Sequence, residues 1–264
     1  MEIQEASSMK RYMYQKFVEL TNRKWSSSLL KRFTASTVSK LIIPSYKKAF
    51  SISDDEWMNP ETGYQSLQDF FTRQVQQDKR PVSSDEKSII SPVDGTIEYA
   101  GTITEKDEYV VKGITYSIED LLGSKEYAKV FNGGEVMVLY LSPANYHRIH
   151  SPVTGKVGRQ WIFGRSSYPV NHFGLTYGKQ PLSRNYRMVT EVITSKGQMA
   201  FVKVGAMFVN SIHLSNTTEH WQRGEEVGLF RFGSTVIILT QKETMIRMKD
   251  SGPVKMGEEI GRFR

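Results

Sequence analysis

The sequence contains no cysteine among its 264 residues. This absence excludes a disulfide framework, a thiolate nucleophile and a metal site built on cysteine. The chain also has no uninterrupted apolar run of about 18 residues, which argues against a membrane-spanning helix. Its acidic start (MEIQE) has no signal-peptide core, so we expect an intracellular protein, either soluble or bound to a membrane surface.

The positive charge is concentrated at one end. Residues 1–50 hold ten Lys and Arg against three acidic residues, a net charge of +7, whereas the remaining 214 residues hold 25 of each sign. Basic amphipathic helices that carry aromatic side chains suit an anionic membrane surface, but a helical cap packed on the main domain is an equal alternative. No nucleic-acid-binding signature is present. The residues that we expect at a membrane surface are Lys10, Arg11, Lys16, Trp25, Lys31 and Arg32.

The spacing of apolar residues predicts helices first and strands afterwards. Three helical stretches are expected within residues 9–44, the last ending at Pro44, and one more between Leu67 and Val75. Short apolar or alternating runs then follow, separated by Gly, Asn and Pro turns, as is typical of an antiparallel β sandwich or barrel. They cover residues 109–111, 136–141, 188–193, 200–204 and 235–239. We therefore predict a mainly β fold with N-terminal helices (α+β), divided into a helical segment, 1–60, and a β-rich domain, 61–264.

Two internal repeats refine this prediction. Residues 91–97 (SPVDGTI) return as 151–157 (SPVTGKV), and residues 224–230 (GEEVGLF) return as 257–263 (GEEIGRF). Such repeats indicate duplicated supersecondary units, here similar to the duplicated β motif of barrel-sandwich folds, although common turn sequences are an alternative. The first repeat differs at Asp94, where the second copy has a threonine. This acid is either an addition for chemistry or a turn-capping residue, which is the commoner role.

Two of the five histidines, His147 and His150, lie in one short segment (YHRIH). A spacing of three places them on one side of a helical turn but on opposite faces of a strand, and a turn would let both imidazoles face one cleft. Three interpretations stay open. The pair serves metal ligation with Asp94 as a third ligand, acid–base chemistry, or structure alone.

A Gly-Ser dipeptide, Gly233 and Ser234, stands at the entry to the last predicted strand. Glycine can adopt a strained turn and leaves its carbonyl open to approach. The serine hydroxyl can then attack that carbonyl and form a backbone ester, provided that a base and an oxyanion-stabilising environment assist. A simple turn before a strand is the alternative.

Three motifs together carry a family resemblance: Asp94 in PVDG, the YHRIH segment, and residues 233–235 (GST). They occur in the order typical of phosphatidylserine decarboxylases, and the chain resembles the bacterial, membrane-associated proenzymes of that family over nearly its whole length. The family usually has leucine before GST, where this chain has Phe232.

The resemblance implies a self-processing proenzyme. The cut would fall between Gly233 and Ser234, giving a heterodimer of a β chain (1–233) and an α chain (234–264), with a higher oligomer left open. Asp94, His150 and Ser234 would form the self-processing triad, in which Asp94 orients His150 and His150 deprotonates Ser234. The ester would break by β-elimination, and the new α-chain end would become a pyruvoyl group.

The resemblance also implies the reaction. Phosphatidylserine would be converted to phosphatidylethanolamine and CO2 through a Schiff base on the pyruvoyl group, which acts as an electron sink without pyridoxal phosphate or a metal. His147 resembles the family residue assigned to the decarboxylation step. A lipid substrate favours docking of the basic helices on an anionic membrane, at the cytoplasmic face of the cell membrane, and implies no nucleic-acid partner.

Two other functions compete with this one. A zinc hydrolase on a similar scaffold would use His147, His150 and Asp94 as ligands and would need no chain cleavage. A barrel-sandwich carrier module would also keep an intact chain. Neither explains the setting of Gly233 and Ser234.

Overall fold

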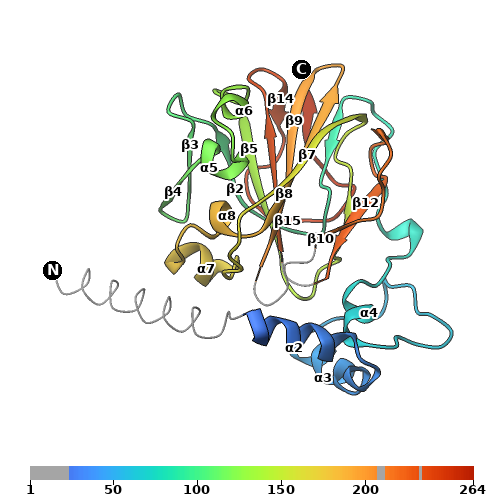
Figure 1. The fold of residues 1–264 in the computed structure, drawn as a ribbon. Helices are drawn as coiled ribbons and strands as arrows, with labels where there is room; N and C mark the ends of the chain where they lie inside the picture. Colours follow the sequence, from blue (N-terminus) through green and yellow to red (C-terminus); the bar gives the residue numbers. More distant parts are fainter. Residues whose placement is uncertain (1–23, 207–211, 232–233) are drawn as a thin grey trace.

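The computed structural model describes residues 24–206, 212–231 and 234–264. Helices α2 (Lys24–Ala35), η1 (Thr37–Ile42) and α3 (Ile43–Ala49) come first, and α4 (Leu67–Phe71) follows. Figure 1 shows α2, α3 and α4 gathered beyond one end of a β-rich body, with the C-terminus at the opposite end. The mainly β, α+β fold predicted from the sequence is confirmed. No helix in the described ranges is long and apolar enough to cross a membrane.

The helix predictions have mixed outcomes. The stretch from Trp25 to Phe33 is helical, within α2, whereas the stretch predicted before it lies outside the described residues. The prediction that a helix ends at Pro44 is wrong, because Pro44 lies in the first turn of α3, where a missing N–H costs no hydrogen bond. The helix expected up to Val75 ends at Phe71 instead.

An eight-stranded antiparallel sheet forms the body. Its strand order is β11-β7-β8-β9-β13-β5-β2-β15. The strands are β2 (Gly95–Thr102), β5 (Glu135–Leu141), β7 (Gly155–Phe163), β8 (Arg187–Thr194), β9 (Gly197–Gly205), β11 (His220–Trp221), β13 (Ser234–Thr240) and β15 (Gly252–Val254). Strand β13 is buried along its whole length, and its alternate residues enter two cores: Ile237 and Leu239 on one face, Val236 and Ile238 on the other. The period of two places Ser234 on the Val236 face.

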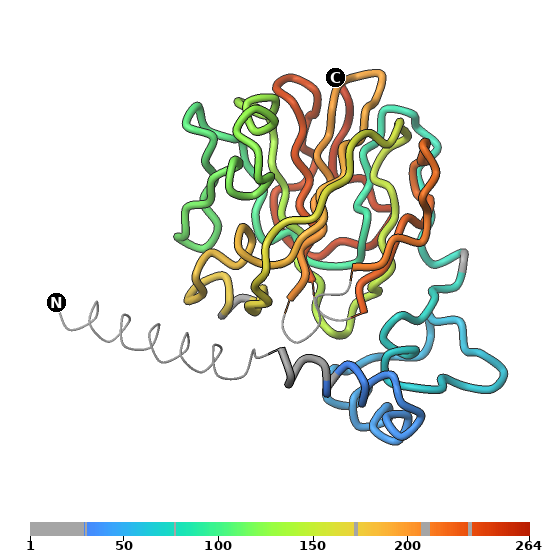
Figure 2. The backbone as a smooth tube through the Cα atoms, viewed as in Figure 1, coloured from blue at the N-terminus to red at the C-terminus, as the bar shows by residue number. Residues whose placement is uncertain are grey.

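Smaller sheets and helices complete the body. Three-stranded sheets have the orders β1-β16-β14 and β10-β12-β6, and β3 pairs with β4. Their strands are β1 (Ser88–Ile90), β3 (Glu108–Val111), β4 (Ile114–Ser117), β6 (Arg148–His150), β10 (Ile212–Leu214), β12 (Glu226–Phe230), β14 (Met245–Arg247) and β16 (Glu259–Phe263). The helices are η2 (Gln77–Lys79), α5 (Ile118–Leu122), α6 (Lys125–Lys129), α7 (His172–Tyr177) and α8 (Pro181–Arg184). Figure 2 traces the chain from the blue helices into this body.

The sequence repeats form two copies of one strand-and-turn unit. The first copy combines residues 88–95 with 256–263, and the second copy combines residues 148–155 with 223–230. The strands of each copy pair antiparallel with an irregularity at the same place. Ile89 lies opposite Gly261 in the first copy, and Ile149 lies opposite Gly228 in the second. The predicted duplication is therefore confirmed by the strand register.

Each copy also closes its turn in the same way. The hydroxyl of Ser91 donates to the carbonyl of Val93 at 2.6 Å, and that of Ser151 donates to Val153 at 2.7 Å. A glycine N–H then reaches each serine carbonyl, from Gly257 at 3.0 Å in one copy and from the equivalent glycine at 2.9 Å in the other. The common sequence thus encodes a common hydrogen-bonded framework.

The two copies are joined to each other reciprocally. The amide of Ile90 donates to the carbonyl of Pro152 at 3.1 Å, and the amide of His150 donates to the carbonyl of Pro92 at 2.9 Å. Ile90 and His150 occupy equivalent positions in the two copies, as do the two prolines. This exchange brings the Asp94 turn of one copy directly against the His150 strand of the other.

Candidate active site

Asp94 caps a turn in the first copy. Its Oδ1 accepts the backbone N–H of Met256 at 2.8 Å. Thr154, at the equivalent position of the second copy, uses its Oγ1 to accept the N–H of Arg223 at 3.1 Å. The capping role, left open by the sequence, is thus observed, and what Asp94 adds over threonine is a negative charge.

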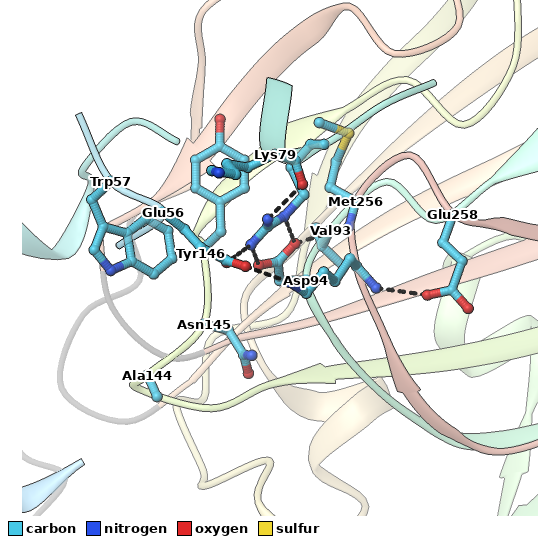
Figure 3. Close-up of polar contacts among 12 residues, drawn as sticks. Glu56, Trp57, Lys79, Val93, Asp94, Ala144, Asn145, Tyr146, Met256 and Glu258 are labelled. Atoms are coloured by element: carbon cyan, nitrogen blue, oxygen red, sulfur yellow. Dashed lines mark hydrogen bonds and ion pairs between the residues drawn. The ribbon is translucent and has the colours of Figure 1, made fainter. Parts of the chain in front are cut away.

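That charge is paired with Arg80. The Arg80 guanidinium donates from Nε to Oδ1 of Asp94 at 2.8 Å and from Nη2 to Oδ2 at 2.5 Å, and it also reaches Glu56 (Figure 3). Both Arg80 and Asp94 are buried. Burial would lower the pKa of Arg80, but hydrogen bonds and charges from Asp94 and Glu56 raise it, so the guanidinium stays charged. A pocket of about 460 Å³ beside the pair is also lined by Trp57, Asn145, Lys255 and Glu258.

His150 has partners on both ring nitrogens. Nδ1 lies 2.8 Å from the carbonyl of Gly224, and Nε2 lies 3.1 Å from the hydroxyl of Tyr146. Because a carbonyl only accepts, Nδ1 carries the proton and Nε2 accepts from the phenol. Burial lowers the pKa of His150, although the Gly224 carbonyl and nearby acidic groups raise it. His150 is therefore a neutral imidazole whose Nε2 can act as a base.

His147 is fully buried in the loop before β6. Its Nδ1 donates to the carbonyl of Asn145 at 2.8 Å, and its ring lies over that of Phe71, with 3.8 Å between the ring centroids. Burial, followed by the charge of Arg73, lowers the pKa of His147 to about 3. Its Nε2 has no hydrogen-bond partner within the described ranges. The ring is therefore neutral, with an unused lone pair on Nε2.

Ser234 begins the central strand β13. It pairs with Leu141 of β5 on one side and Gly205 of β9 on the other, and it is fully buried. Its Oγ has no hydrogen-bond partner in the part of the chain that the structure describes. The loop that carries His147 starts directly after Leu141, and the amide of Phe230 donates to the His147 carbonyl at 2.9 Å. Ser234 and His147 thus belong to the same end of the sheet.

The predicted triad is only partly brought together. The turn of Asp94 and the strand of His150 are linked through backbone, and the charge of Asp94 raises the pKa of His150. Among the described residues, no side-chain hydrogen bond joins Asp94, His150 and Ser234 to one another, because the carboxylate is bound to Arg80 and both nitrogens of His150 are engaged. Gly233 lies outside the described residues. The catalytic roles of these residues remain predictions.

The zinc alternative finds little support in this geometry. Within residues 24–206, 212–231 and 234–264, no group of three His, Asp or Glu side chains is arranged to hold a metal ion. Asp94, the expected third ligand, is instead committed to a guanidinium and a backbone amide.

The predicted membrane-binding residues fall into two sets. Lys31 and Arg32 are exposed on α2, and Trp25 also lies in α2. The others, Lys10, Arg11 and Lys16, lie outside the described residues. Their contact with a membrane remains a prediction.

Sequence reasoning missed several partners in the site. Gly224 opens the second repeat and Tyr146 lies within the YHRIH segment, so both carried a signal that could have drawn notice. Arg80 and Arg73 belong to no repeat or motif. They reach the site through tertiary contacts to residues 14 and 71 positions away, which no local pattern reveals.

Comparison with known proteins identifies the family. The family model described as phosphatidylserine decarboxylase matches residues 67–262. Proteins named phosphatidylserine decarboxylase proenzyme are similar along nearly the whole chain. One from Geobacillus sp. (strain WCH70) is 48% identical over 256 residues, 96% of this chain and 99% of the relative, and one from Anoxybacillus flavithermus is 47% identical, covering 96% and 97%. One from Bacillus cereus (strain ATCC 10987 / NRS 248) is 47% identical over 255 residues, with the same coverage.

These matches confirm the resemblance inferred from the three motifs and the prediction of a decarboxylase. The match to the family model includes Asp94, both histidines and Ser234. The chain belongs to the phosphatidylserine decarboxylase family.

Proposed function

We propose that this chain cuts itself between Gly233 and Ser234 and then converts phosphatidylserine to phosphatidylethanolamine and CO2. The observation that carries the proposal is the Ser234 hydroxyl, which is buried in the central strand without a partner among the described residues. An unsatisfied buried polar group costs about 1–3 kcal/mol. Thr235 and Thr240 of the same strand also have such hydroxyls, and Ser234 differs from them in following Gly233 directly.

The surroundings of Ser234 are compatible with a pyruvoyl group. Conversion of the serine would break no side-chain hydrogen bond, because its Oγ makes none with the described residues, and Gly205 opposite has no side chain to crowd the site. Once formed, such a group supplies an electron sink, reached through a Schiff base with the substrate amine. Ser234 itself would hold it, at the end of β13.

We assign the processing base to His150. Its neutral ring keeps Nδ1–H on the Gly224 carbonyl, so Nε2 is the basic nitrogen, and it would have to exchange its hydrogen bond from Tyr146 for one from Ser234 to take the hydroxyl proton. Asp94 supports it indirectly. By capping the turn, Asp94 holds the Pro92 carbonyl that receives the His150 amide, and its charge raises the pKa of the imidazole. Asp94 thus supports His150, and His150 acts on Ser234, as in the predicted triad, but the link from Asp94 to His150 runs partly through backbone hydrogen bonds.

We assign proton handling at the substrate α carbon to His147. Its Nε2 is unprotonated, fully buried and without a partner among the described residues, as a base or proton carrier shielded from water requires. Phe71 covers one face of the ring and helps to exclude water.

We further propose that the N-terminal helices dock this enzyme on the cytoplasmic face of the cell membrane. Large apolar side chains are exposed along them, including Leu29 (63%), Val38 (63%) and Leu41 (79%). Exposed cations stand among these side chains: Lys31, Arg32, Lys40 and Lys48. Each cation near an anionic surface contributes about 1 kcal/mol. Their position beyond one end of the body leaves these helices free to face a bilayer (Figure 1).

Intact-mass measurement tests the cleavage. We expect two fragments, residues 1–233 and 234–264, with the smaller one carrying a terminal carbonyl that hydride reagents reduce. Ser234→Ala should give one uncut chain and no decarboxylation. A preparation that decarboxylates phosphatidylserine while retaining the unmodified full-length mass would contradict the proposal.

Vesicle binding tests the docking. We expect Leu29→Ser combined with Leu41→Ser to reduce association with vesicles that contain phosphatidylserine by about tenfold, because two exposed apolar anchors are lost. Ile246→Ser, which removes an exposed apolar side chain from β14 in the body, serves as the control and should bind normally. Equal binding by all the variants would reject these helices as the anchor.

A further inference from the structure

We propose that Arg73 is a positioning residue for His147: its guanidinium holds the carbonyl that receives the His147 Nδ1 proton and leaves Nε2 as the free acceptor. This inference rests on the proposed function only in taking His147 as the proton carrier of decarboxylation. Nothing in the self-processing triad requires Arg73.

The contacts of Arg73 converge on the loop that carries His147. Arg73 follows α4 and is 2% exposed. Its Nη2 donates to the carbonyl of Ala144 at 2.6 Å and lies 3.3 Å from that of Asn145, while Nη1 donates to Phe70 at 3.2 Å. The Asn145 carbonyl is the same group that accepts from Nδ1 of His147. One carbonyl is therefore shared between the guanidinium and the imidazole.

Arg73 is a buried cation whose partners, among the described residues, are carbonyls and aromatic rings rather than a carboxylate. The guanidinium carbon lies 4.0 Å from the ring centroid of Trp57 and 4.7 Å from that of Phe70. Burial lowers the pKa of Arg73 to about 10, so the side chain remains charged at neutral pH. Burying such a charge is costly, and an apolar residue would pack against the same rings more cheaply. The charge therefore calls for a role beyond packing.

That role is visible in the protonation state of His147. A carbonyl fixed beside Nδ1 selects the tautomer with the proton on Nδ1, and a nearby positive charge disfavours a second proton on Nε2. Three elements face the ring. Phe71 covers it from α4, Asn145 binds it from its own loop, and the amide of Phe230 in β12 donates to the His147 carbonyl. Arg73 is the only charged side chain described that shifts the pKa of His147.

Neighbouring contacts hold the same loop without adding charge at the ring. The Arg148 guanidinium donates from Nε to the carbonyl of Thr72 at 3.0 Å. Each of residues 71–73 thus contacts the segment 144–148. The contacts of Phe71 and Thr72 would be enough to anchor the loop, whereas control of the His147 proton needs Arg73.

Ring-nitrogen NMR tests this inference without relying on turnover. The processed protein, labelled with ¹⁵N in its five histidines, is titrated with acid, and His147 is assigned from the signal lost in His147→Asn. In the parent protein we expect His147 to remain neutral, with the proton on Nδ1, down to about pH 5. Arg73→Gln keeps hydrogen-bonding capacity but removes the charge, and it should raise the His147 midpoint by about one pH unit or more. An unchanged midpoint would overturn the inference.

A second variant, Arg73→Lys, separates the effect of the Arg73 charge from that of its two hydrogen bonds, through the midpoint and the tautomer of His147. Arg73→Lys keeps the charge, so the midpoint should stay near the parent value. Its single ammonium cannot hold two carbonyls as the fork does, so a second tautomer, protonated on Nε2, should appear. A single Nδ1-protonated signal in Arg73→Lys would overturn the positioning role, and this variant also serves if Arg73→Gln does not fold.

Arg187 provides the matched control. It is likewise buried and donates to three backbone carbonyls, those of Asp120, Leu121 and Asn185, but it lies in β8. Arg187→Gln should cost stability and leave the His147 titration unchanged. A shift as large as that of Arg73→Gln would overturn the inference. A protein without decarboxylase activity would refute the proposed function. The titration would still test the role of Arg73, because it follows a ring proton of His147 and not turnover.

Discussion

The two copies of the duplicated unit share their framework and differ where chemistry is expected. Both close the turn with a serine hydroxyl, and both cap it with an oxygen side chain, Asp94 in one and Thr154 in the other. At the next pair of equivalent positions, the first copy has Ile90 and the second has His150. Each copy thus carries one of the two groups expected to do chemistry, and the reciprocal hydrogen bonds bring the two positions together.

This difference distinguishes the side chains that the shared framework needs from those that only the proposed chemistry needs. Thr154 demonstrates that the cap needs no charge, and Ile90 demonstrates that the strand needs no imidazole. The carboxylate of Asp94 and the ring of His150 are therefore not needed for the strand-and-turn framework that the two copies share. Exchanging residues between the copies tests that conclusion, and the stability of each variant is best measured in the uncut Ser234→Ala background.

The largest effect is expected from Asp94→Thr, which gives the first copy the cap of the second. Threonine can still accept the N–H of Met256, but buried Arg80 loses its bidentate partner and keeps Glu56 as a carboxylate partner, beside the Lys79 carbonyl. Removing one partner of a buried ion pair costs about 3 kcal/mol or more. Denaturant unfolding should report this loss, and intact mass should find the chain uncut when Ser234 is present. A stable, self-cleaving Asp94→Thr protein would show that the charge is dispensable.

A smaller effect is expected from His150→Ile, which gives the second copy the residue of the first. The folded-state pKa of His150 lies below its unfolded value of about 6.5, so the folded protein binds fewer protons. The contribution of His150 to the free energy of unfolding is therefore fully present above about pH 6.5. Below that pH it falls, by up to about 1.4 kcal/mol per pH unit.

His150→Ile should lose less stability than its parent between about pH 6.5 and 5 and should remain uncut. His147 is present in both proteins, so the difference between their unfolding curves isolates His150. Parallel losses of stability with pH would contradict the assignment of a buried neutral imidazole at position 150.

The smallest effect is expected from Thr154→Asp, the reverse exchange. The new carboxylate can still accept the N–H of Arg223, and Thr154 is exposed, so its charge is screened by water. Stability should change by less than about 0.5 kcal/mol. Cleavage should proceed normally, as followed by intact mass. Impaired cleavage would mean that the Thr154 turn affects the self-processing reaction, contrary to this prediction.

Much of the fold could be predicted from the sequence because the strands are buried on both faces. The runs at 136–141 and 235–239 are apolar apart from Thr235, and they form adjacent central strands. Pro44 misled the prediction because proline both follows helices and begins them. The division at residue 60, the oligomeric state and the membrane contact remain predictions.

The site was predictable only in part, for a different reason. Asp94, His147, His150 and Ser234 stand in short motifs, so their chemistry could be read from the sequence. Their partners could not, because Arg80 and Arg73 meet them through tertiary contacts rather than through a local pattern. The sequence therefore predicted the reacting groups better than the groups that set their charge and orientation.

The position of Ser234 at the start of β13 has a consequence for the life of the protein. The 31 residues from Ser234 onward supply β13 between β9 and β5, β15 at a sheet edge, and two of the three strands in the sheet that contains β1. If the proposed cut before Ser234 occurs, the C-terminal fragment cannot dissociate without disrupting both sheets. Once parted by denaturant, however, two separate chains in solution would have to find each other and rebuild the middle of a sheet. We therefore expect the cut protein to resist dissociation of its two chains but to refold poorly after denaturation.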